Sequence, residues 1–520
     1  MANQKQREEL HRTIWAMADD LRGQAGGWEF KAYVLGTLFY RFISENLTDY
    51  INKLQAEAGI EGFDYTAMSD EEAEQARDMM VTEKGFFILP SQLFQNVCKH
   101  CEQDENLNMT LSKVFKAIEG SAIGTASEDD MKGLFSDFNV DSIFLGSDVK
   151  TRNKNMAKVL LKIRDMNLGD EFLDNKIDAF GDAYEFLMTM YASGAGKSGG
   201  EFFTPQEVCE LLARLAAADG HEIRSVYDPA CGSGSLLLKF SKTIGRKNPN
   251  LMYYGQEINP TTYNLCRINM FLHNINYDKF DIQLGDTLVN PLHRQLEPFD
   301  AIVSNPPYSI EWEGSKNPLL INDDRFSGPG VLAPDKTADL AFTLHMLASL
   351  SESGTAAIVE FPGVLYRGGK EKSIRQWLIE NNYIDTIIQL PSNLFFGVGI
   401  ATCIIVLRKG MRPDNQVLFI DASREFVKNG NKNRLTKENQ DHIFNVFAER
   451  KEEQYFSCLV PNADILANDA NLSVSSYVEQ EDTREVIDIK AVKAKMVELI
   501  AEGEELNRKI DEIVKELGGK

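Results

Sequence analysis

Apolar runs of strand length alternate with helical stretches through the middle of the chain, and this alternation restricts the possible folds more than any other feature. The expected strands cover residues 223–228, 251–257, 281–286, 299–305, 355–361, 383–390 and 401–407. The expected helices cover residues 236–243, 260–272, 338–350 and 371–380. Such alternation is typical of parallel strands joined by right-handed crossovers. We therefore predict an α/β fold with a doubly wound, Rossmann-like sheet.

The segments on either side of this alternation have a different pattern. Residues 1–170 carry apolar and aromatic side chains at helical spacing, first around residues 10–21 and again around residues 28–43. Clear strand alternation is absent there. We predict three domains: an α-helical domain over residues 1–170, the sheet domain over residues 171–480, and a C-terminal helical tail over residues 481–520 that serves subunit contact.

The C-terminal segment follows a heptad spacing. Its apolar positions recur alternately every three and four residues, at Ile489, Val492, Met496, Leu499, Leu506, Ile510, Ile513 and Leu517. Gly503 stands at the position in this series that is not apolar, and it should weaken or kink the helix. A period of 3.5 residues favours pairing with a partner helix. The alternative is a helix that packs on its own domain.

The composition is that of a globular protein, with 43% hydrophobic and 26% charged residues over 520 positions. The sequence has no apolar run of membrane-spanning length, and the first ten residues lack a signal-peptide pattern. The seven cysteines are scattered, and Cys98 and Cys101 form a Cys-x-x-Cys that no second pair follows. Free thiols are therefore favoured over a zinc site. We predict a cytoplasmic protein with no metal centre and no membrane contact.

The formal net charge of −23 argues against strong binding to nucleic acid by the chain alone. Affinity for DNA comes largely from Lys and Arg side chains that neutralise phosphates. Either DNA is not the substrate, or a basic partner supplies much of the grip. The same acidic balance is also common in soluble enzymes that bind no DNA.

Acidic residues stand at the ends of the first three expected strands. Asp228 can bind an ammonium group, Glu257 can hold both hydroxyls of a ribose, and Asp286 could reach the amine of adenine. The turn after Asp228 is built of small residues that let the main chain approach a ligand. They include Gly232, Ser233, Gly234 and Ser235. A nucleoside joined to an amino acid suits this set, and S-adenosylmethionine is the cofactor that we predict.

The expected strand at residues 299–305 breaks into Asn305-Pro306-Pro307-Tyr308. The two prolines stiffen the loop, and Pro306 holds Asn305 out of the helical region. The Asn305 side chain and the Pro306 main chain offer carbonyl oxygens, and Tyr308 offers an aromatic face. Two acceptors beside a flat surface suit a planar group that carries an amine, such as a nucleobase.

Three motifs carry a resemblance to a known family. They are Gly-Glu-Phe-Phe-Thr-Pro at residues 200–205, Asp-Pro-Ala-Cys-Gly-Ser-Gly at residues 228–234, and Asn-Pro-Pro-Tyr at residues 305–308. In this order they resemble the amino-methyltransferases of DNA. Further motifs lie at residues 21–23, 39–44, 324–328, 363–369 and 390–395. With them the chain resembles, over nearly its whole length, the methylation subunit of a type I restriction–modification system.

The resemblance implies roles for individual residues in a methyltransferase sheet. Asn305, Pro306, Pro307 and Tyr308 would form the catalytic loop of an adenine-N6 methyltransferase, and Asp228 and Glu257 would hold the amine and the ribose of S-adenosylmethionine. The methionine part of the cofactor would be lined by Glu201, Phe202, Phe203, Thr204, Pro205, Gln206 and residues 233–235. Adenine in a duplex cannot reach such a pocket, so it would have to flip out of the helix.

The resemblance also implies partners. A separate specificity subunit would read the DNA sequence, two methylation subunits would clamp double-stranded DNA, and a restriction subunit would join the full complex. The irregular stretch at residues 309–337 would order when DNA binds. Two alternatives stay open. Asn-Pro-Pro-Tyr also serves methylation of a protein glutamine at N5, and a non-catalytic scaffold subunit could keep the same fold.

Overall fold

In this computed structural model the described residues are 27–166, 204–218, 222–244, 248–395, 399–410, 414–430, 432–480 and 489–518, with single residues at 12, 168, 183, 187, 220 and 412. The chain divides into two compact units, Met1–Val478 and Glu479–Lys520. The predicted domain boundary at residues 170/171 and the predicted helix at residues 10–21 lie outside the described residues. Both stay predictions.

The first part of the larger unit is helical, as the spacing of its apolar residues predicted. The helices are α2 (Gly27–Glu57), α3 (Asp70–Ala73), α4 (Arg77–Lys84), α5 (Phe94–His100), α6 (Leu107–Gly120), α7 (Glu128–Met131) and α8 (Val149–Arg164). The aromatic stripe of α2 lies in the core, where Tyr33, Phe39 and Phe42 are buried. Each such side chain contributes on the order of 1.5–3 kcal/mol by its removal from water, so α2 organises this layer.

A nine-stranded sheet forms the rest of the larger unit, in the order β11-β8-β6-β7-β5-β4-β1-β2-β3. Its strands are β1 (Ser225–Asp228), β2 (Met252–Glu257), β3 (Phe280–Leu284), β4 (Phe299–Ser304), β5 (Leu350–Glu360), β6 (Ile384–Gln389), β7 (Cys403–Arg408), β8 (Gln416–Asp421) and β11 (Ser457–Pro461). All seven predicted strands are present, and the predicted doubly wound α/β sheet is confirmed.

The direction of the strands decides where their ends meet. Strands β3, β2, β1, β4 and β5 are parallel to one another, and β6 is parallel to β8. Strand β7 runs antiparallel to both β5 and β6, and β11 runs antiparallel to β8. The sequence did not predict these two reversals. Because β7 is antiparallel to both β5 and β6, strands β1 to β6 and β8 all point the same way, and their carboxyl ends lie at one edge of the sheet.

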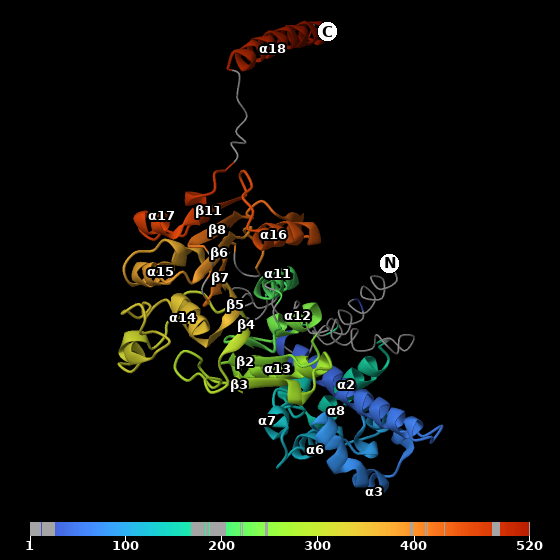
Figure 1. Cartoon of the computed structure of the whole chain (residues 1–520). Coiled ribbons are helices and arrows are strands. Elements are labelled where there is room, and N and C mark those ends of the chain that lie inside the picture. Colours follow the sequence, from blue (N-terminus) through green and yellow to red (C-terminus); the bar gives the residue numbers. More distant parts are fainter. Residues whose placement is uncertain are drawn as a thin grey trace. The chain divides into compact units, whose positions relative to one another are not determined.

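Both faces of the sheet are buried, because successive strand residues point to opposite sides. One core contains Val226, Val303 and Val359, and the other contains Tyr227, Ile302 and Ile358. The first face is covered by α11 (Gln206–Ala216), α12 (Ser235–Thr243), α13 (Pro260–Leu272) and α16 (Lys437–Glu449). The second is covered by α14 (Asp339–Ser349), α15 (Lys370–Glu380) and α17 (Asn462–Ala467). Figure 1 shows these two layers on opposite sides of the strands.

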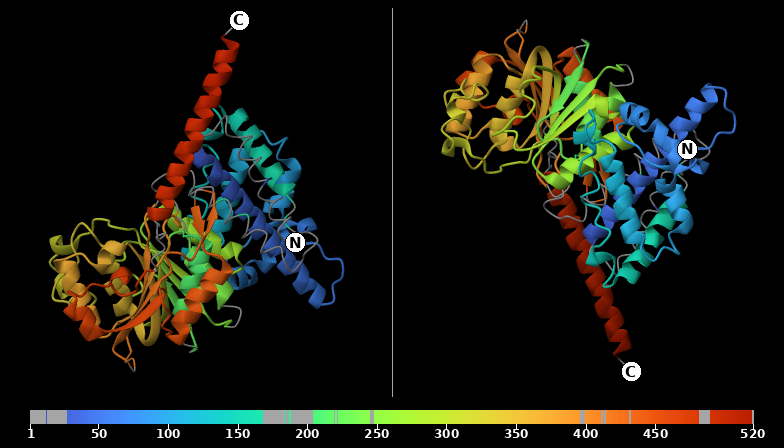
Figure 2. Two further views of the ribbon diagram at one scale, coloured as in Figure 1. Left: turned by 90° about the horizontal axis from the view of Figure 1, so that it is seen from above. Right: turned by 90° about the horizontal axis from the view of Figure 1, so that it is seen from below.

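The N-terminal helices continue the first of these cores. The ring of Phe271, near the end of α13, lies 6.2 Å from that of Phe39 and 6.4 Å from that of Phe86. Both views in Figure 2 show the N-terminal helices beside the β3 end of the sheet. Aromatic contacts of this kind stabilise by more than their buried area alone, so α13 is the element that joins the helical part to the sheet.

The irregular stretch at residues 309–337 is built into the second core. Trp312 and Phe326 are buried, and the Arg325 guanidinium donates to the main-chain oxygens of Thr287 and Leu288 at 2.9 Å each. The expectation that this stretch orders only when DNA binds is therefore wrong. Its irregular composition concealed two aromatic anchors and a buried arginine that hold it against the sheet.

The smaller unit contains the helix α18 (Ile489–Leu517). Every apolar residue of the predicted heptad series is exposed on it, and three more exposed apolar residues widen the stripe, namely Val497, Ile500 and Val514. A stripe of this width is typical of a helix that packs in a bundle rather than in a strict two-stranded seam. Within the described part of the chain, no helix is both long enough and apolar enough to cross a membrane.

Candidate functional site

The predicted site residues that the structure describes gather at the carboxyl edge of the sheet. Three hydrogen bonds join the loops there. Thr287 Oγ1 donates to the Pro229 main-chain oxygen at 2.6 Å, and the backbone N–H of Gly285 donates to the main-chain oxygen of Glu257 at 2.9 Å. The Ser304 hydroxyl donates to Asp228 Oδ1 at 2.8 Å. The ends of β1, β2, β3 and β4 are thereby fixed as one surface.

Asp228 is the most unusual group of this surface. It ends β1, is 1% exposed, and accepts a second hydrogen bond on Oδ1 from the Ala230 backbone N–H. Its other oxygen, Oδ2, is buried and has no hydrogen-bond partner among the described residues. Burial raises the pKa of Asp228 to about 7, against these two hydrogen bonds, which lower it. A buried acceptor without a donor fits a ligand that brings a cation such as an ammonium.

The turn after Asp228 needs its glycines. Gly232 and Gly234 adopt φ angles of +54° and +82°, which side chains other than glycine rarely accept. A Cβ on Gly234 would also meet the Cys266 sulfur at 2.8 Å. Ser233 is buried, and its hydroxyl lies 3.3 Å from that of Ser235 at the start of α12. The turn thus brings bare main chain and the amino end of α12 to the carboxyl edge.

Glu257 and Asp286 lie on the same surface, at the ends of β2 and β3. The Glu257 carboxylate accepts from the backbone N–H groups of Gly232 at 2.9 Å and Asn259 at 2.8 Å. Burial raises the pKa of Glu257. Asp286 Oδ1 accepts from the backbone N–H of Leu288 at 2.9 Å. Each carboxylate is held by main chain and keeps lone pairs for further donors, as a ribose or an amine would require.

A second hydrogen-bonded group lies at the end of β4. The Asn305 amide donates to Thr204 Oγ1 at 3.0 Å, and the Tyr308 hydroxyl donates to Asn305 Oδ1 at 2.6 Å. Thr204 is buried and directly precedes Pro205, the N-cap of α11, which begins at Gln206. Asn305 therefore contacts both of the predicted residues Thr204 and Tyr308, although 101 residues separate it from Thr204.

Two buried carboxyl groups that the sequence did not point to lie behind this loop. Asp339 Oδ1 accepts from the backbone N–H of Ser309, the residue after Tyr308, at 3.0 Å. Glu360 ends β5, is fully buried, and accepts from Thr343 Oγ1 at 3.0 Å. Burial, and then the neighbouring charge of Asp339, raises the pKa of Glu360 well above its ordinary value. The one available signal was a glutamate at the end of an apolar strand.

The phenol of Tyr308 keeps its proton in these surroundings. Burial raises its pKa well above the ordinary value, and the carboxyl groups of Glu360 and Asp339 add to the effect. Tyr308 is therefore a hydrogen-bond donor at neutral pH. It holds the Asn305 side chain in one orientation, with the amide nitrogen toward Thr204 and the oxygen toward the phenol.

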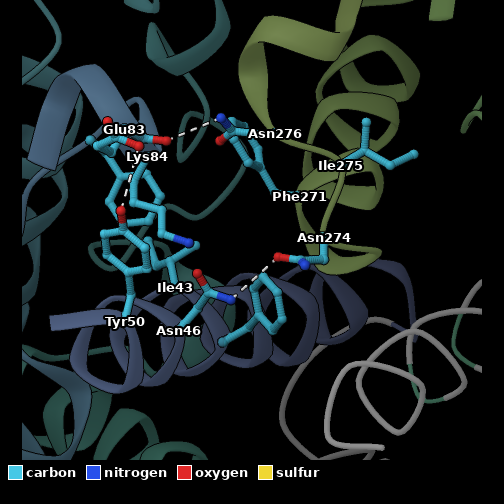
Figure 3. Close-up of a pocket in the computed structure, with 11 residues that line it drawn as sticks. Ile43, Asn46, Tyr50, Glu83, Lys84, Phe271, Asn274, Ile275 and Asn276 are labelled. Carbon is cyan, nitrogen blue, oxygen red and sulfur yellow. Dashed lines mark hydrogen bonds between the residues drawn. The ribbon is translucent and has the colours of Figure 1, made fainter. Parts of the chain in front are cut away.

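A cavity of about 210 Å³ lies beside the N-terminal helices, and Figure 3 shows the side chains that line it. It lies between α2, α4 and the end of α13. Because α13 starts at the carboxyl edge of the sheet, its end lies near the amino edge. Its polar groups bond to one another: Tyr50 donates to Glu83 at 3.4 Å, and Asn276 donates to the Glu83 main chain at 3.1 Å. The cavity is remote from Asp228 and Asn305, so we assign it no part in the chemistry.

Some predictions lie beyond the described residues. Glu201, Phe202 and Phe203 belong to them, and so does Gly200 of the same motif. Cys98 and Cys101 are both buried thiols, and burial raises the pKa of Cys98 to about 12. No cluster of His, Cys, Asp or Glu in the described ranges has the form of a metal site.

Comparison with protein families gives two matches that together cover most of the chain. The family model described as N-6 DNA Methylase matches residues 175–486. The model described as HsdM N-terminal domain matches residues 10–163. The first match contains every strand of the sheet and every predicted site residue, and the second contains the N-terminal helices α2 to α7 and nearly all of α8.

Individual relatives agree with these matches. The methylase subunit of the type I restriction enzyme MpnII from Mycoplasma pneumoniae is 47% identical over 99% of this chain and 97% of its own length. The MjaVIII methylase subunit from Methanocaldococcus jannaschii is 33% identical over 62% of this chain and 57% of its own length. A crystal structure of a type I methyltransferase subunit from Streptococcus thermophilus matches with a TM-score of 0.82 and 32% identity, covering 91% of this chain and 100% of that one.

Proposed function

This chain belongs to the N-6 DNA methylases and, within them, to the methylase subunits of type I restriction enzymes, and on that premise we propose how its residues act. The cofactor is S-adenosylmethionine, and the acceptor is the N6 amine of an adenine flipped out of duplex DNA. One contact carries the proposal. The 2.8 Å hydrogen bond from Ser304 to Asp228 joins the cofactor turn to the loop that begins at Asn305, and transfer between two ligands needs adjacent sites.

The cofactor is held by the turn between β1 and α12 and by the neighbouring strand ends. Asp228 Oδ2 accepts the ammonium group of the methionine part, which supplies the partner that this buried oxygen lacks among the described residues. Glu257 accepts from the ribose hydroxyls, and Asp286 from the adenine amine. Gly232, Ser233, Gly234 and Ser235 line the cofactor with main chain and small side chains. Bound S-adenosylmethionine supplies the methyl group.

The target base is held by Asn305, Pro306 and Tyr308, with Pro307 keeping the loop stiff. The amine of adenine is a weak nucleophile because its lone pair is delocalised into the ring. Asn305 Oδ1 and the Pro306 carbonyl accept its two N–H groups, which favours a pyramidal and more nucleophilic nitrogen. The same oxygens stabilise the positive charge that develops on nitrogen, and the face of Tyr308 adds to this. In the absence of a base, the Tyr308 hydroxyl occupies Asn305 Oδ1.

Thr204 connects the two halves of the site. Its hydroxyl accepts the Asn305 amide hydrogen, so that Oδ1 is the atom left to face the base. Together with Glu201, Phe202, Phe203, Pro205 and Gln206 it lines the methionine part of the cofactor. This placement gives the Phe-Thr-Pro motif two tasks, which are to cover the cofactor and to fix the rotamer of the catalytic asparagine.

The partners follow from the charge and from the tail. With a net charge of −23 the chain relies on a specificity subunit for its grip on double-stranded DNA. We place two methylase subunits and one specificity subunit in the modifying complex, which a restriction subunit joins. Residues 1–170 form a helical domain, residues 171–480 the catalytic domain, and residues 481–520 the helix that docks on a partner.

A pair of substitutions tests the proposal. Asp228→Asn should weaken binding of S-adenosylmethionine by about 30-fold or more, because a buried charge pair is lost. Asn305→Ala should leave that affinity unchanged and lower kcat for DNA by about 10²–10³-fold. Isothermal titration and a methylation assay measure the two effects.

The matched control is Asp300→Asn. Asp300 is also a buried aspartate on a strand of this sheet, and it accepts from the Arg224 backbone N–H at 2.9 Å, at the amino end of β4. Its loss should leave cofactor affinity unchanged. Equal losses of affinity in Asp228→Asn and Asp300→Asn would mean that the effect is one of folding and would remove the assigned role.

A further inference from the structure

A basic hairpin stands out on this acidic chain. Strands β9 (Val427–Asn429) and β10 (Lys432–Arg434) pair in antiparallel fashion after β8. Residues 422–437 contain five basic residues, Arg424, Lys428, Lys432, Arg434 and Lys437, and one acidic residue, Glu425. The segment therefore carries a net charge of +4 (5 − 1), where the whole chain carries −23. A local reversal of sign of this size calls for an anionic partner.

The hairpin lies at the carboxyl edge of the sheet, where the site is. It follows the end of β8, which is parallel to β6 and ends at the same edge. Its second strand bonds to the loop after β6: Lys432 Nζ donates to the Phe395 oxygen at 2.7 Å, and the Asn433 amide donates to the Ser392 oxygen at 2.8 Å. These contacts fix a hairpin that would be only marginally stable by itself.

The hairpin also reaches the element that positions Asn305. Burial raises the pKa of Glu207, and the Leu435 backbone N–H and the Arg434 guanidinium act on the same carboxylate in the opposite direction. Glu207 lies in the first turn of α11, three residues after Thr204, whose hydroxyl binds Asn305. Lys437 forms an ion pair with Glu210 of the same helix at 3.2 Å. The base of the hairpin therefore packs on α11, the helix that follows Thr204.

The tip is exposed and polar. All three residues of β9 are exposed, as is Arg434. Asn429 and Lys428 present an amide and an ammonium group, and Gly430 turns the chain with a φ of +60°. Lys, Arg and Asn side chains are among the groups that contact phosphate oxygens in protein–DNA complexes. A protein partner would favour aromatic or apolar anchors instead, and Val427 is the one large apolar side chain exposed within the described part of the hairpin.

We propose that the β9–β10 hairpin binds the phosphate backbone of the DNA substrate beside the flipped adenine. Lys428 and Arg434 make the contacts. Parallel strands lie about 4.8 Å apart, and β8 is four places from β4 in the sheet. The end of β8, from which the hairpin starts, thus lies roughly 20 Å along the same edge from the end of β4, which Asn305 follows. This inference rests on the proposed function and adds a DNA contact to a chain that has few basic clusters.

The test measures how DNA affinity depends on salt. The probe is a fluorescent duplex of arbitrary sequence, titrated with the full chain in complex with its specificity subunit between about 50 and 200 mM salt. Each phosphate contact contributes about 0.9 to the slope of log K against log[salt]. Loss of one contact therefore lowers the affinity by about 5-fold at 0.15 M salt. Lys428→Gln should show one such loss. Lys428→Gln with Arg434→Gln should show two, or about 30-fold, with the slope lower by about 1.8.

Two further variants separate charge from structure. Arg434→Lys keeps the charge and should keep the slope. Lys451→Gln removes a lysine that is 54% accessible and follows the end of α16. The neighbouring Arg450 pairs with Asp385 at the start of β6, which locates this part of the chain. That lysine lies at the amino edge of the sheet, and its loss should change neither affinity nor slope.

Three outcomes would overturn the proposal: an unchanged slope in the double variant, an equal loss in Lys451→Gln, or failure of the double variant to assemble with the specificity subunit. The last would make the hairpin a protein contact. The same preparations are assayed for N6-methyladenine. If the unaltered complex forms none, the proposed function fails, whereas the comparison of slopes still decides the role of the hairpin.

Discussion

Two hydrogen bonds of Asn305 define the state of the catalytic loop. Thr204 fixes the amide nitrogen, and Tyr308 occupies the oxygen at 2.6 Å. For adenine to bind as proposed, the Tyr308 hydroxyl must leave Asn305 Oδ1 while the ring stays to stack on the base. In this proposal the hydroxyl occupies Asn305 Oδ1 only until the base binds, and the aromatic face is the part of the side chain that contacts the base.

Substitutions at Tyr308 distinguish these two parts. Tyr308→Phe removes only the hydroxyl and should keep kcat within about 3-fold, since base stacking depends on the ring. Tyr308→Ala removes the stacking surface, worth roughly 1–3 kcal/mol, and should lower kcat/KM by about 5- to 150-fold. Steady-state methylation of DNA measures both, with the exposed Tyr455 changed to Ala as a control. Abolished turnover in Tyr308→Phe would contradict the stacking role.

The carboxyl group of Asp228 makes cofactor binding depend on pH. Burial raises its pKa to about 7 in the protein without ligand, whereas the unfolded chain has a value near 4. A raised folded-state pKa means that the stability it contributes is complete below about pH 4 and is lost as pH rises through about 7. An ammonium ligand prefers the ionised carboxylate, so binding below pH 7 must release a proton.

We therefore expect the affinity for S-adenosylmethionine to rise as pH increases from about 5 to 7, with protons released on binding. Calorimetry in buffers of different ionisation enthalpy counts these protons. Asp228→Asn should bind more weakly than the unaltered chain near pH 7, should approach its affinity towards pH 5, where the carboxyl is protonated, and should show no such release from this site. Proton release of the same size in Asp228→Asn would place the titrating group elsewhere.

The sequence predicted part of this residue-level picture. Asp228, Glu257 and Asp286 follow strand ends, and the parallel direction of β1 to β3 brings such ends together, which made their grouping predictable. The contact of Thr204 with Asn305 could not be read from spacing, because it joins segments 101 residues apart. The carboxyl pair of Asp339 and Glu360 was missed for the same reason, since only the tertiary structure brings α14 and β5 behind the loop.

At the level of elements, apolar runs identified strands but not their direction. All seven predicted strands formed, because a buried strand needs apolar residues on both faces. Strand β7 resembles the other strands in sequence, yet it is antiparallel. A run of apolar residues carries no information on the direction in which its strand runs. The hairpin of β9 and β10 was missed because its residues are polar and its stability comes from contacts with residues 392–395.

The helix α18 is the element whose role is easiest to isolate. A chain that ends at residue 480 should bind S-adenosylmethionine with unchanged affinity, because the site residues lie in the unit that ends at Val478. It should fail to assemble with a specificity subunit, because the exposed apolar stripe is lost. Size-exclusion chromatography of the mixed subunits reports the assembly. Normal assembly of the shortened chain would contradict the docking role.

Gly503 tests the same helix more gently. A Cβ at this position meets no atom of the described residues within 4 Å, and alanine favours a helix by about 1 kcal/mol over glycine. Gly503→Ala should raise helicity and tighten assembly by about 5-fold. Glu502→Ala changes a neighbouring exposed residue and serves as the control. Weaker assembly of Gly503→Ala would mean that the partner approaches this position so closely that only glycine, which has no side chain, leaves room for it.

For the whole molecule, the net charge of −23 and a DNA substrate are compatible only if other subunits share the binding. The fold places the catalytic loop, the cofactor turn and the basic hairpin at one edge of a single sheet. The acidic remainder of the surface discourages non-specific binding. Under the proposed function, dependence on a specificity subunit follows, and it would link the chemistry proposed for Asn305 to the assembly proposed for α18.

The most direct test is transfer of a labelled methyl group from S-adenosylmethionine to DNA, by the chain alone and with the specificity subunit encoded beside it. The labelled product is digested and identified as a nucleoside. We predict N6-methyladenine only when the partner is present, and its loss in Asn305→Ala. Label in protein would favour methylation of glutamine, and no transfer under any condition would favour a non-catalytic scaffold. Either result would contradict the proposed function.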